Sequence, residues 1–402
     1  MTRNYTLLSL VCLALSVPLI VYLAGRDSVQ ETPVVRFGTF NLALHRPEAG
    51  ALLRELDGGR SEPARRLAEI VQRLRIDVLL VNELDRDDAG RTADVFAEQY
   101  LNVSQDGQAP IDFAYRYAAP VNTGEPSGRD LDGDGDAGGP GDAWGYGAFP
   151  GQYGMALFSR YPILADRVRT FRLLSWSAMP DALRPEGFWD DDTWRALRLS
   201  SKSHWDVPIG IGTQDDGLVV HALCSHPTPP AFDGPEDRNG RRNHDEIRFW
   251  VDYLTPGAGG WIVDDEGVAG GLDEGAAFVV LGDLNCDPVD GEARREALLR
   301  LLGHSRVQDP EPRSVGGAEA KLAQFGLNMQ HQGDPALDTG DFADEVGRGP
   351  GNLRVDYVLP SAGLTVTQSG VFWPQAFEPA AALGATSDHR LVWVELALPP
   401  RR

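Results

Sequence analysis

The chain has 402 residues, of which 42% are hydrophobic and 24% are charged, and this composition is that of an ordinary globular protein. Acidic residues outnumber basic ones by 59 to 37, and the resulting net charge of −22 excludes a protein that covers a nucleic-acid backbone with a broad basic face. A hydrolase that contacts only a few phosphates stays compatible with this charge.

The N-terminus has the pattern of an export signal. Arg3 precedes an apolar stretch over residues 7–24, and polar residues follow from Arg26. The stretch is longer than most signal-peptide cores, is close to the lower limit for a membrane span and lacks a good cleavage site. Residues 1–25 are therefore expected to be either a signal peptide or a retained membrane anchor. The remaining chain would be secreted, periplasmic or anchored at the outer side of the cytoplasmic membrane, with no other membrane contact.

Apolar runs that end in polar side chains predict the strands. In chain order they cover residues 34–41, 77–83, 218–224, 277–283, 355–359 and 390–396. The runs over 77–83 and 277–283 are too apolar to face water on either side, so they should lie in a sheet that is covered on both faces. Polar residues at the ends of such strands are where α/β enzymes place their chemistry.

Helical periodicity appears between these runs. Ser61-Glu62-Pro63 opens a segment in which Leu67, Ile70, Val71 and Leu74 follow helical spacing. Further helices are expected at about 92–103, 241–254 and 292–302. The alternation of helices and strands predicts an α/β fold. Segments rich in Gly, Pro and Asp are expected to be surface loops, at about 104–150, 170–215, 255–276 and 303–350.

Polar signatures stand at the ends of the predicted strands. They are Thr39-Phe40-Asn41, Asn82-Glu83, Ser225-His226-Pro227, Gly282-Asp283-Leu284-Asn285 and Ser387-Asp388-His389, with Val355-Asp356-Tyr357-Val358-Leu359 between the last two. Carboxylates, amides and imidazoles that converge on one cleft can hold a divalent metal and split a phosphate ester. Because the signatures extend from residue 41 to residue 389, one large catalytic domain is favoured over two domains.

This set, in this order, resembles the endonuclease/exonuclease/phosphatase superfamily, which includes DNase I-like nucleases, inositol polyphosphate phosphatases and neutral sphingomyelinases. The resemblance extends from about Val34 to Leu398. It implies a catalytic domain over residues 33–398 with a four-layer α/β sandwich, in which two packed mixed sheets are flanked by helices.

The resemblance also implies roles for individual residues. Glu83 would bind the catalytic Mg²⁺ or Mn²⁺, with Asn41 and Asp388 near the metal. Asp283 would activate the attacking water, and Asn285 would bind the phosphate or the transition state.

Two histidines complete the implied site. His389 would contact the phosphoryl group and be oriented by Asp356. His226 matches a histidine of the branch that includes DNase I and sphingomyelinases, where it is a candidate general acid for the leaving oxygen; other branches have Asn there.

The residues themselves leave simpler interpretations open. Glu83 ends a run too apolar for an unpaired carboxylate, so it needs a cation or a donor, unless it is a surface glutamate in a salt bridge. Asp283 and Asn285 share a face if the strand continues through them, but the same residues are typical of an Asx turn. A lone histidine is more often a hydrogen-bonded core residue than a catalyst.

Cations gather at one place in this acidic chain, over residues 194–205. Arg198 and Lys202 are candidate substrate-binding residues there, because Arg and Lys clamp phosphoryl groups. The alternative is a solvated strand edge.

An acidic segment resembles the first half of an EF-hand loop, with Asp130, Asp132, Asp134 and Asp136 at alternate positions. The glutamate expected at the twelfth position is replaced by Gly141. The segment is either a structural Ca²⁺ site or a flexible acidic loop.

Cys224 and Cys286 each lie beside a signature, but the alternation of side chains along strands places them on different faces. Two buried free thiols are therefore favoured over a disulfide.

These features together predict an exported, divalent-metal-dependent phosphoesterase that hydrolyses a phosphate mono- or diester through a metal-activated water. The substrate would be a small molecule, a lipid head group or a nucleic acid, without a stable nucleic-acid complex. The alternatives are an extracellular nuclease of the DNase I type and a catalytically silent binding domain on the same fold.

Overall fold

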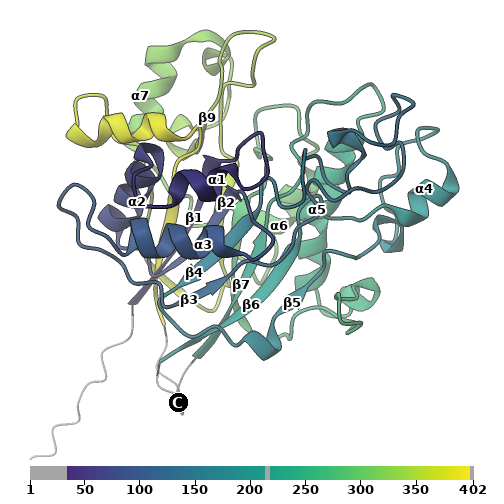
Figure 1. Ribbon diagram of the computed structural model, residues 1–402, viewed down its shortest axis with the longest axis horizontal. Coiled ribbons are helices and arrows are strands. Elements are labelled where there is room, and N and C mark those ends of the chain that lie inside the picture. Colours follow the sequence, from purple (N-terminus) through teal and green to yellow (C-terminus); the bar gives the residue numbers. More distant parts are fainter. Residues whose placement is uncertain (1–33, 213–217, 399–402) are drawn as a thin grey trace, which may run out of the picture. The chain divides into compact units, whose positions relative to one another are not determined.

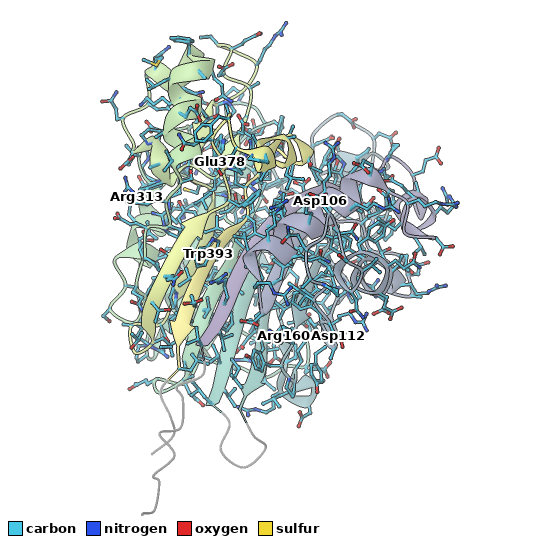
Figure 2. The ribbon with its side chains drawn as sticks, turned by 90° about the vertical axis from the view of Figure 1, so that its left-hand side faces the viewer. Asp106, Asp112, Arg160, Arg313, Glu378 and Trp393 are labelled. Atoms are coloured by element: carbon cyan, nitrogen blue, oxygen red, sulfur yellow. The ribbon has the colours of Figure 1, made fainter. Side chains whose placement is uncertain are left out.

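The first large sheet has the strand order β12-β13-β1-β2-β4-β3 in the computed structural model, which describes residues 34–212 and 218–398 (Figure 1). Its strands are β1 (Val34–Leu44), β2 (Val78–Leu84), β3 (Tyr115–Tyr117), β4 (Met155–Ser159), β12 (Thr365–Val371) and β13 (Val392–Ala397). β1 and β2 are parallel, and Asn41 lies opposite Asn82. Figure 2 shows β12 and β13 in yellow, with Trp393 on β13.

The second sheet has the order β11-β8-β7-β6-β5. Its strands are β5 (Arg169–Thr170), β6 (His204–Ile211), β7 (Leu218–Ser225), β8 (Ala277–Asp283) and β11 (Asp356–Pro360). β7 and β8 are parallel, whereas β8 and β11 are antiparallel with Asp283 opposite Asp356. A separate two-stranded sheet pairs β9 (Gly340–Asp341) with β10 (Asn352–Leu353).

The helices are α1 (Ala51–Leu56), α2 (Glu62–Leu74), α3 (Arg91–Phe96), α4 (Asp191–Ala196), α5 (Arg238–Leu254), α6 (Glu296–Leu302) and α7 (Val315–Gln324). A π-helical turn over Ala97–Leu101 extends α3, and short 3₁₀ turns lie at 140–142, 165–167, 176–178, 258–261, 326–329, 335–337 and 379–386. Within the described residues, no helix is long and apolar enough to cross a membrane. The predicted export segment, residues 1–25, lies outside the described part of the chain.

Three apolar clusters hold the layers together. The central one lies between the two sheets and includes Phe37 and Leu80 from one sheet and Val207 and Leu281 from the other. A second cluster packs α1, α2 and α3 on the outer face of the first sheet, and a third packs α5 and α6 on the outer face of the second (Figure 1). This arrangement confirms the predicted sandwich of two mixed sheets flanked by helices.

Local signals placed most elements well. Ser61 caps α2, because its Oγ accepts a hydrogen bond from the Ala64 amide at 3.5 Å. The helix predicted from residue 292 begins only at Glu296, since the Asp287 carboxylate accepts bonds from the amides of Val289 and Asp290 and holds that segment as a turn.

The expectation of a surface loop over residues 170–215 was wrong. This stretch contains β6, which pairs with β7 along its whole length and is buried at almost every position. Pro208 and Gly210 lie within that strand and hid its signal. The expected loop over 303–350 likewise contains α7.

Cys224 and Cys286 are buried free thiols, as predicted. Cys224 lies between the two sheets, whereas Cys286 packs with the cluster beneath α5 and α6. The second sheet therefore separates them.

Candidate active site

The site lies where the two sheets meet at the ends of their strands. Asn41 and Glu83 come from the parallel pair β1 and β2, so both reach the same edge. Asp283 ends β8, and His226 follows its parallel neighbour β7. The Asn41 Nδ2 atom lies 3.1 Å from Asp283 Oδ2 and joins the two edges directly.

Asn41 lies between two carboxylates. Its Nδ2 atom donates to Glu83 Oε1 at 3.0 Å as well as to Asp283, and the side chain is fully buried. The sequence predicted that this strand ends at Asn41. In the structure β1 shifts register after Asn41 and continues to Leu44. Ala43 in this irregularity has φ 49°, and its amide donates to Asn41 Oδ1 at 3.1 Å. A bulge of this kind re-aims a side chain next to a site.

Glu83 has a left-handed backbone, with φ 56°. This backbone conformation is strained for a residue with a Cβ atom, so the contacts around Glu83 must stabilise it. Its carboxylate contacts the Asn41 amide and lies 3.6 Å from His45 Nε2. These contacts point into the site, in contrast to the surface salt bridge left open by the sequence. His45 was missed by the sequence analysis, since only its place four residues after Asn41 could have suggested it.

Asp283 is the most connected side chain of the site. Besides Asn41, His226 Nε2 lies 3.4 Å and His389 Nε2 lies 3.7 Å from its Oδ2 atom. Burial alone would raise the pKa of Asp283, but the nearby imidazoles of His389 and His226 outweigh it and hold that pKa below its usual range. Asp283 is therefore an ionised carboxylate despite being buried.

The strand does not continue through Asn285, so the predicted shared face was wrong. Asn285 has φ 52°, and its amide donates to Asp283 Oδ1 at 2.9 Å, which is the Asx turn that the sequence left open. Its Nδ2 atom donates to the Pro227 carbonyl at 3.1 Å. Gly282 permits the close approach of β7, because a Cβ atom there would lie 2.0 Å from the Ser225 oxygen. This turn links the loops that carry His226 and Asp283.

His389 and Asp356 are paired as the resemblance implied. His389 Nδ1 lies 2.9 Å from Asp356 Oδ2, and both side chains are buried. Burial disfavours the charged imidazole, but the Asp356 and Asp283 carboxylates prevail and raise the pKa of His389 to about 10. Ser387 fixes the loop that carries His389. Its Oγ donates to the backbone oxygen of Asn41 at 2.8 Å and accepts from the backbone amide of His389 at 3.0 Å.

His226 differs from His389 in its surroundings. Burial lowers the pKa of His226, and the nearby Lys202 lowers it further, although Asp283 opposes both. Its Nδ1 atom finds no hydrogen-bond partner among the residues that the structure describes. A neutral imidazole is favoured, which works against an imidazolium acid at neutral pH.

The second half of the segment over residues 194–205 is not a solvated edge, although Arg195 in the first half is exposed. Ser200 to His204 are buried, and Lys202 is only 6% exposed. Burial lowers the pKa of Lys202, while the carboxylates of Glu246, Glu83 and Asp283 oppose that shift. Lys202 and Glu83 line the same cavity.

Arg198 is engaged elsewhere. Its guanidinium donates to Asn122 Oδ1 at 2.5 Å and to Glu125 at 2.9 Å, and lies over the Trp144 ring. Of the two predicted substrate-binding residues, Lys202 lines the same cavity as Glu83, and Arg198 is not in that lining.

Glu246, on α5, was missed by the sequence analysis. One carboxylate oxygen accepts from the Ser201 amide at 2.6 Å and the other accepts from the Thr228 amide at 2.6 Å. Glu246 thus ties together the backbone beside Lys202 and beside His226. A glutamate inside a predicted helix belongs to no motif, so nothing in the sequence set it apart.

Asp388 differs from Asn41 in its exposure to solvent. Its side chain is exposed, and its backbone oxygen accepts from the Asp341 amide at 2.7 Å. Among the described residues, Asp283, Asp356 and His389 each offer one ligand atom within 4.8 Å of the others, and Asp388 is not in that group.

The donors on the Glu83 side fit a hard cation. Glu83 and Asp283 each place a carboxylate oxygen close to Asn41 Nδ2, and carboxylate oxygens are ligands that Mg²⁺ and Mn²⁺ prefer. Asn41 Oδ1 accepts from the Ala43 amide instead, so the fit to a cation rests on the two carboxylates, whose neighbouring negative charges favour a cation beside them.

The acidic loop brings part of its predicted ligand set together. Asp130, Asp132 and Asp134 offer oxygens within 4.8 Å of one another, and Asp136 is not in the group. The Asp130 carboxylate already accepts from the amides of Gly133 and Gly135, at 2.7 and 2.9 Å. Calcium binding by this loop stays a prediction.

The comparisons with known proteins agree with this geometry. The chain matches the Endonuclease/Exonuclease/phosphatase family over residues 38–389, a range that contains both Asn41 and His389. A search of curated proteins finds no significant match.

Several solved structures are similar to the chain. One is an endonuclease/exonuclease/phosphatase from Beutenbergia cavernae, with 16% identity over 91% of this chain and 72% of its own, and a TM-score of 0.48. Another is sphingomyelinase C from Streptomyces griseocarneus, with 16% identity, 90% and 99% coverage and a TM-score of 0.46. A third is a mannosyl-6-phosphatase from Bacteroides thetaiotaomicron, with 14% identity, 90% and 99% coverage and a TM-score of 0.44. Because the family match extends over most of the sequence and includes every predicted catalytic residue, the chain belongs to the endonuclease/exonuclease/phosphatase family.

Proposed function

We propose that the protein is a divalent-metal-dependent phosphoesterase that hydrolyses a phosphate mono- or diester by attack of water on phosphorus, and that it acts outside the cytoplasm. The observation that carries the proposal is the buried, ionised Asp283, which Asn41, His226 and His389 approach from three different segments. Export rests on the sequence of residues 1–25 alone.

Glu83 would hold the metal, with Asn41 beside it. When bound, a divalent ion there would polarise a phosphoryl oxygen and neutralise charge on the phosphate. His45, which lies 3.6 Å from Glu83, would help to orient that carboxylate.

Three further side chains would handle the water and the phosphoryl group. Asp283 can accept a hydrogen bond from the attacking water, but its low pKa makes it a weak base, so its main contribution is orientation. His389, kept protonated by Asp356, would present Nε2–H as a donor to a phosphoryl oxygen. Lys202, which lines the same cavity as Glu83, would offer its amine as a further donor.

The distribution of charge favours a small or lipid-linked phosphoester over a polynucleotide. A polymer needs a basic groove that tracks several phosphates. Of the two basic residues that the sequence singled out, Arg198 is held by Glu125, which also binds Arg172, whereas Lys202 lines the same cavity as Glu83. One such side chain matches one phosphoryl group.

The test is a panel of phosphoesters assayed with Mg²⁺, Mn²⁺ and Ca²⁺. It would contain bis-p-nitrophenyl phosphate, p-nitrophenyl phosphate, sphingomyelin, inositol phosphates, nucleotides, plasmid DNA and RNA. We expect hydrolysis that EDTA abolishes and that Asp283→Asn removes, with small or lipid esters preferred. Hydrolysis of DNA above all others, with a steep dependence on salt, would favour the nuclease alternative. If none of these esters is hydrolysed, the alternative of a catalytically silent binding domain is favoured.

A further inference from the structure

A cavity of about 600 Å³ opens beside the catalytic centre. Glu83, His45 and Lys202 belong to its lining, so the cavity is continuous with the proposed metal and phosphoryl site. Most of the remaining wall is apolar. Leu131, Tyr146, Trp176, Trp189 and Leu197 come from segments that the sequence analysis took for surface loops, and Phe232 adds to them from the segment after β7. The volume is that of a pocket for a small organic molecule, about 300–1,000 Å³.

The two tryptophans offer this cavity hydrocarbon rather than hydrogen bonds. Trp176 Nε1 donates to Asp245 Oδ2 at 2.7 Å, and Trp189 Nε1 donates to the Leu131 carbonyl at 3.0 Å. The two rings pack against each other edge to face, with centroids 6.1 Å apart. Because both indole N–H groups are already satisfied by the protein, a ligand that packs against this pair gains mainly from removing apolar surface from water.

The arginines that line the cavity are also engaged. Arg242 donates to the backbone oxygens of Trp144, Arg198 and Leu199, and Arg238 pairs with Glu236. Lys202 lies in the same lining as Glu83. The cavity therefore combines a place for a phosphoryl group, near Glu83 and Lys202, with a large apolar volume.

Aromatic side chains stand exposed at this cavity. Phe232 is 89% exposed and Tyr146 is 66% exposed, and both belong to the lining. Phe232 also has a left-handed backbone, with φ 64°. Large apolar groups that line a pocket yet remain in water mark a binding surface.

We infer that this cavity holds an apolar organic group of the phosphoester, so that the substrate is a phosphate ester of a hydrophobic alcohol. This inference rests on the proposed function and specifies the substrate class of the same site. The apolar group is an aliphatic chain or a ring system, because the apolar and aromatic side chains of the cavity wall would bury either one by the same hydrophobic contact.

The test uses phosphonates, whose carbon–phosphorus bond is not hydrolysed, and measures their binding by calorimetry in Mg²⁺. Methyl-, butyl- and hexylphosphonate share one head group and differ only in apolar length. We expect affinity to rise about fourfold for each methylene that is buried. A 2-phenylethyl and a naphthylmethyl phosphonate distinguish a ring from a chain. Equal affinity for the methyl and hexyl compounds would overturn the inference.

Variants at the exposed aromatics locate the effect. The double variant Phe232→Ala, Tyr146→Ala should bind hexylphosphonate at least about fivefold more weakly and bind methylphosphonate with unchanged affinity. The two substitutions remove apolar contact area from the cavity wall and leave the site of the phosphonate group intact. Phe377→Ala is the matched control, since Phe377 is 78% exposed and does not line the cavity. An unchanged dependence on chain length in the double variant would place the apolar group elsewhere and overturn the inference.

Hydrolysis of bis-p-nitrophenyl phosphate separates this inference from the proposed function. If wild-type protein hydrolyses this ester but shows no dependence on chain length, the phosphoesterase stands and the hydrophobic substrate class fails. If phosphonates bind more tightly with length but no ester is hydrolysed, the cavity binds apolar phosphates and the proposed catalysis fails.

Discussion

His389 and Asp356 form a hydrogen bond of 2.9 Å between Nδ1 and Oδ2, although 33 positions separate them in the sequence. The carboxylate keeps the proton on Nδ1 and aims Nε2 toward Asp283, where a phosphoryl group would bind. Both side chains are buried, so water does not compete for the hydrogen bond between them.

Asp356→Asn should lower kcat by at least about 100-fold with little change in KM, because it removes the charge that orients and protonates His389. Steady-state kinetics would measure the split, and thermal melting would confirm that the variant folds. Asp338→Asn, at a buried aspartate that is not in the acidic group with His389, is the control. A change in KM alone would show that Asp356 serves substrate binding.

Glu83→Gln should lower hydrolysis by more than about 100-fold and raise the Mg²⁺ concentration needed for half-maximal activity, because it keeps the size of the side chain but removes a ligand charge. Activity is measured across a Mg²⁺ titration. Glu48→Gln serves as the control, since the Glu48 side chain is 79% exposed. Wild-type activity in Glu83→Gln would remove Glu83 from the metal site.

His226→Ala separates acid catalysis from positioning. If His226 protonates the leaving oxygen, alkyl esters should lose at least about 10-fold more activity than p-nitrophenyl esters, whose anion leaves without help. The ratio of kcat/KM for the two ester types is the measurement. Equal losses on both would mean that His226 acts through its 3.4 Å contact with Asp283.

Stability should fall in acid because of His204. Burial lowers the pKa of His204 from 6.5 to about 4. The neutral ring is held by two hydrogen bonds: Nδ1 lies 2.6 Å from Ser200 Oγ, and Nε2 lies 2.9 Å from the backbone oxygen of Glu246. Between those pH values the unfolded chain binds a proton that the folded protein does not. The free energy of unfolding therefore decreases as pH falls from about 6.5 to about 4, by about 3 kcal/mol from this group.

His204→Gln should flatten this part of the pH dependence, and denaturant unfolding at pH 7, 5.5 and 4.5 would measure it. His331→Gln is the control, because His331 lies outside this buried network. An unchanged slope in His204→Gln would assign the acid sensitivity to other groups.

Local chemistry made much of the fold predictable. The strands that contain Glu83 and Asp283 are continuous apolar runs. The helix α2 combines helical periodicity with a Ser61 cap, so each of these signals lies within a few residues. The strand β6 escaped because Pro208 and Gly210 weaken the local preference, whereas its burial between neighbouring strands decides its structure.

The sequence by itself determined which catalytic residue types are present, their order and the strands that end in them, because these depend on local patterns and on resemblance to a family. Only the tertiary structure decided which charges remain free. Glu125, 73 positions before Arg198, pairs with it and with Arg172, while Lys202 lines the same cavity as Glu83. The cavity was equally invisible in sequence, because its walls come from distant segments that acquire a shared shape only when the two sheets pack.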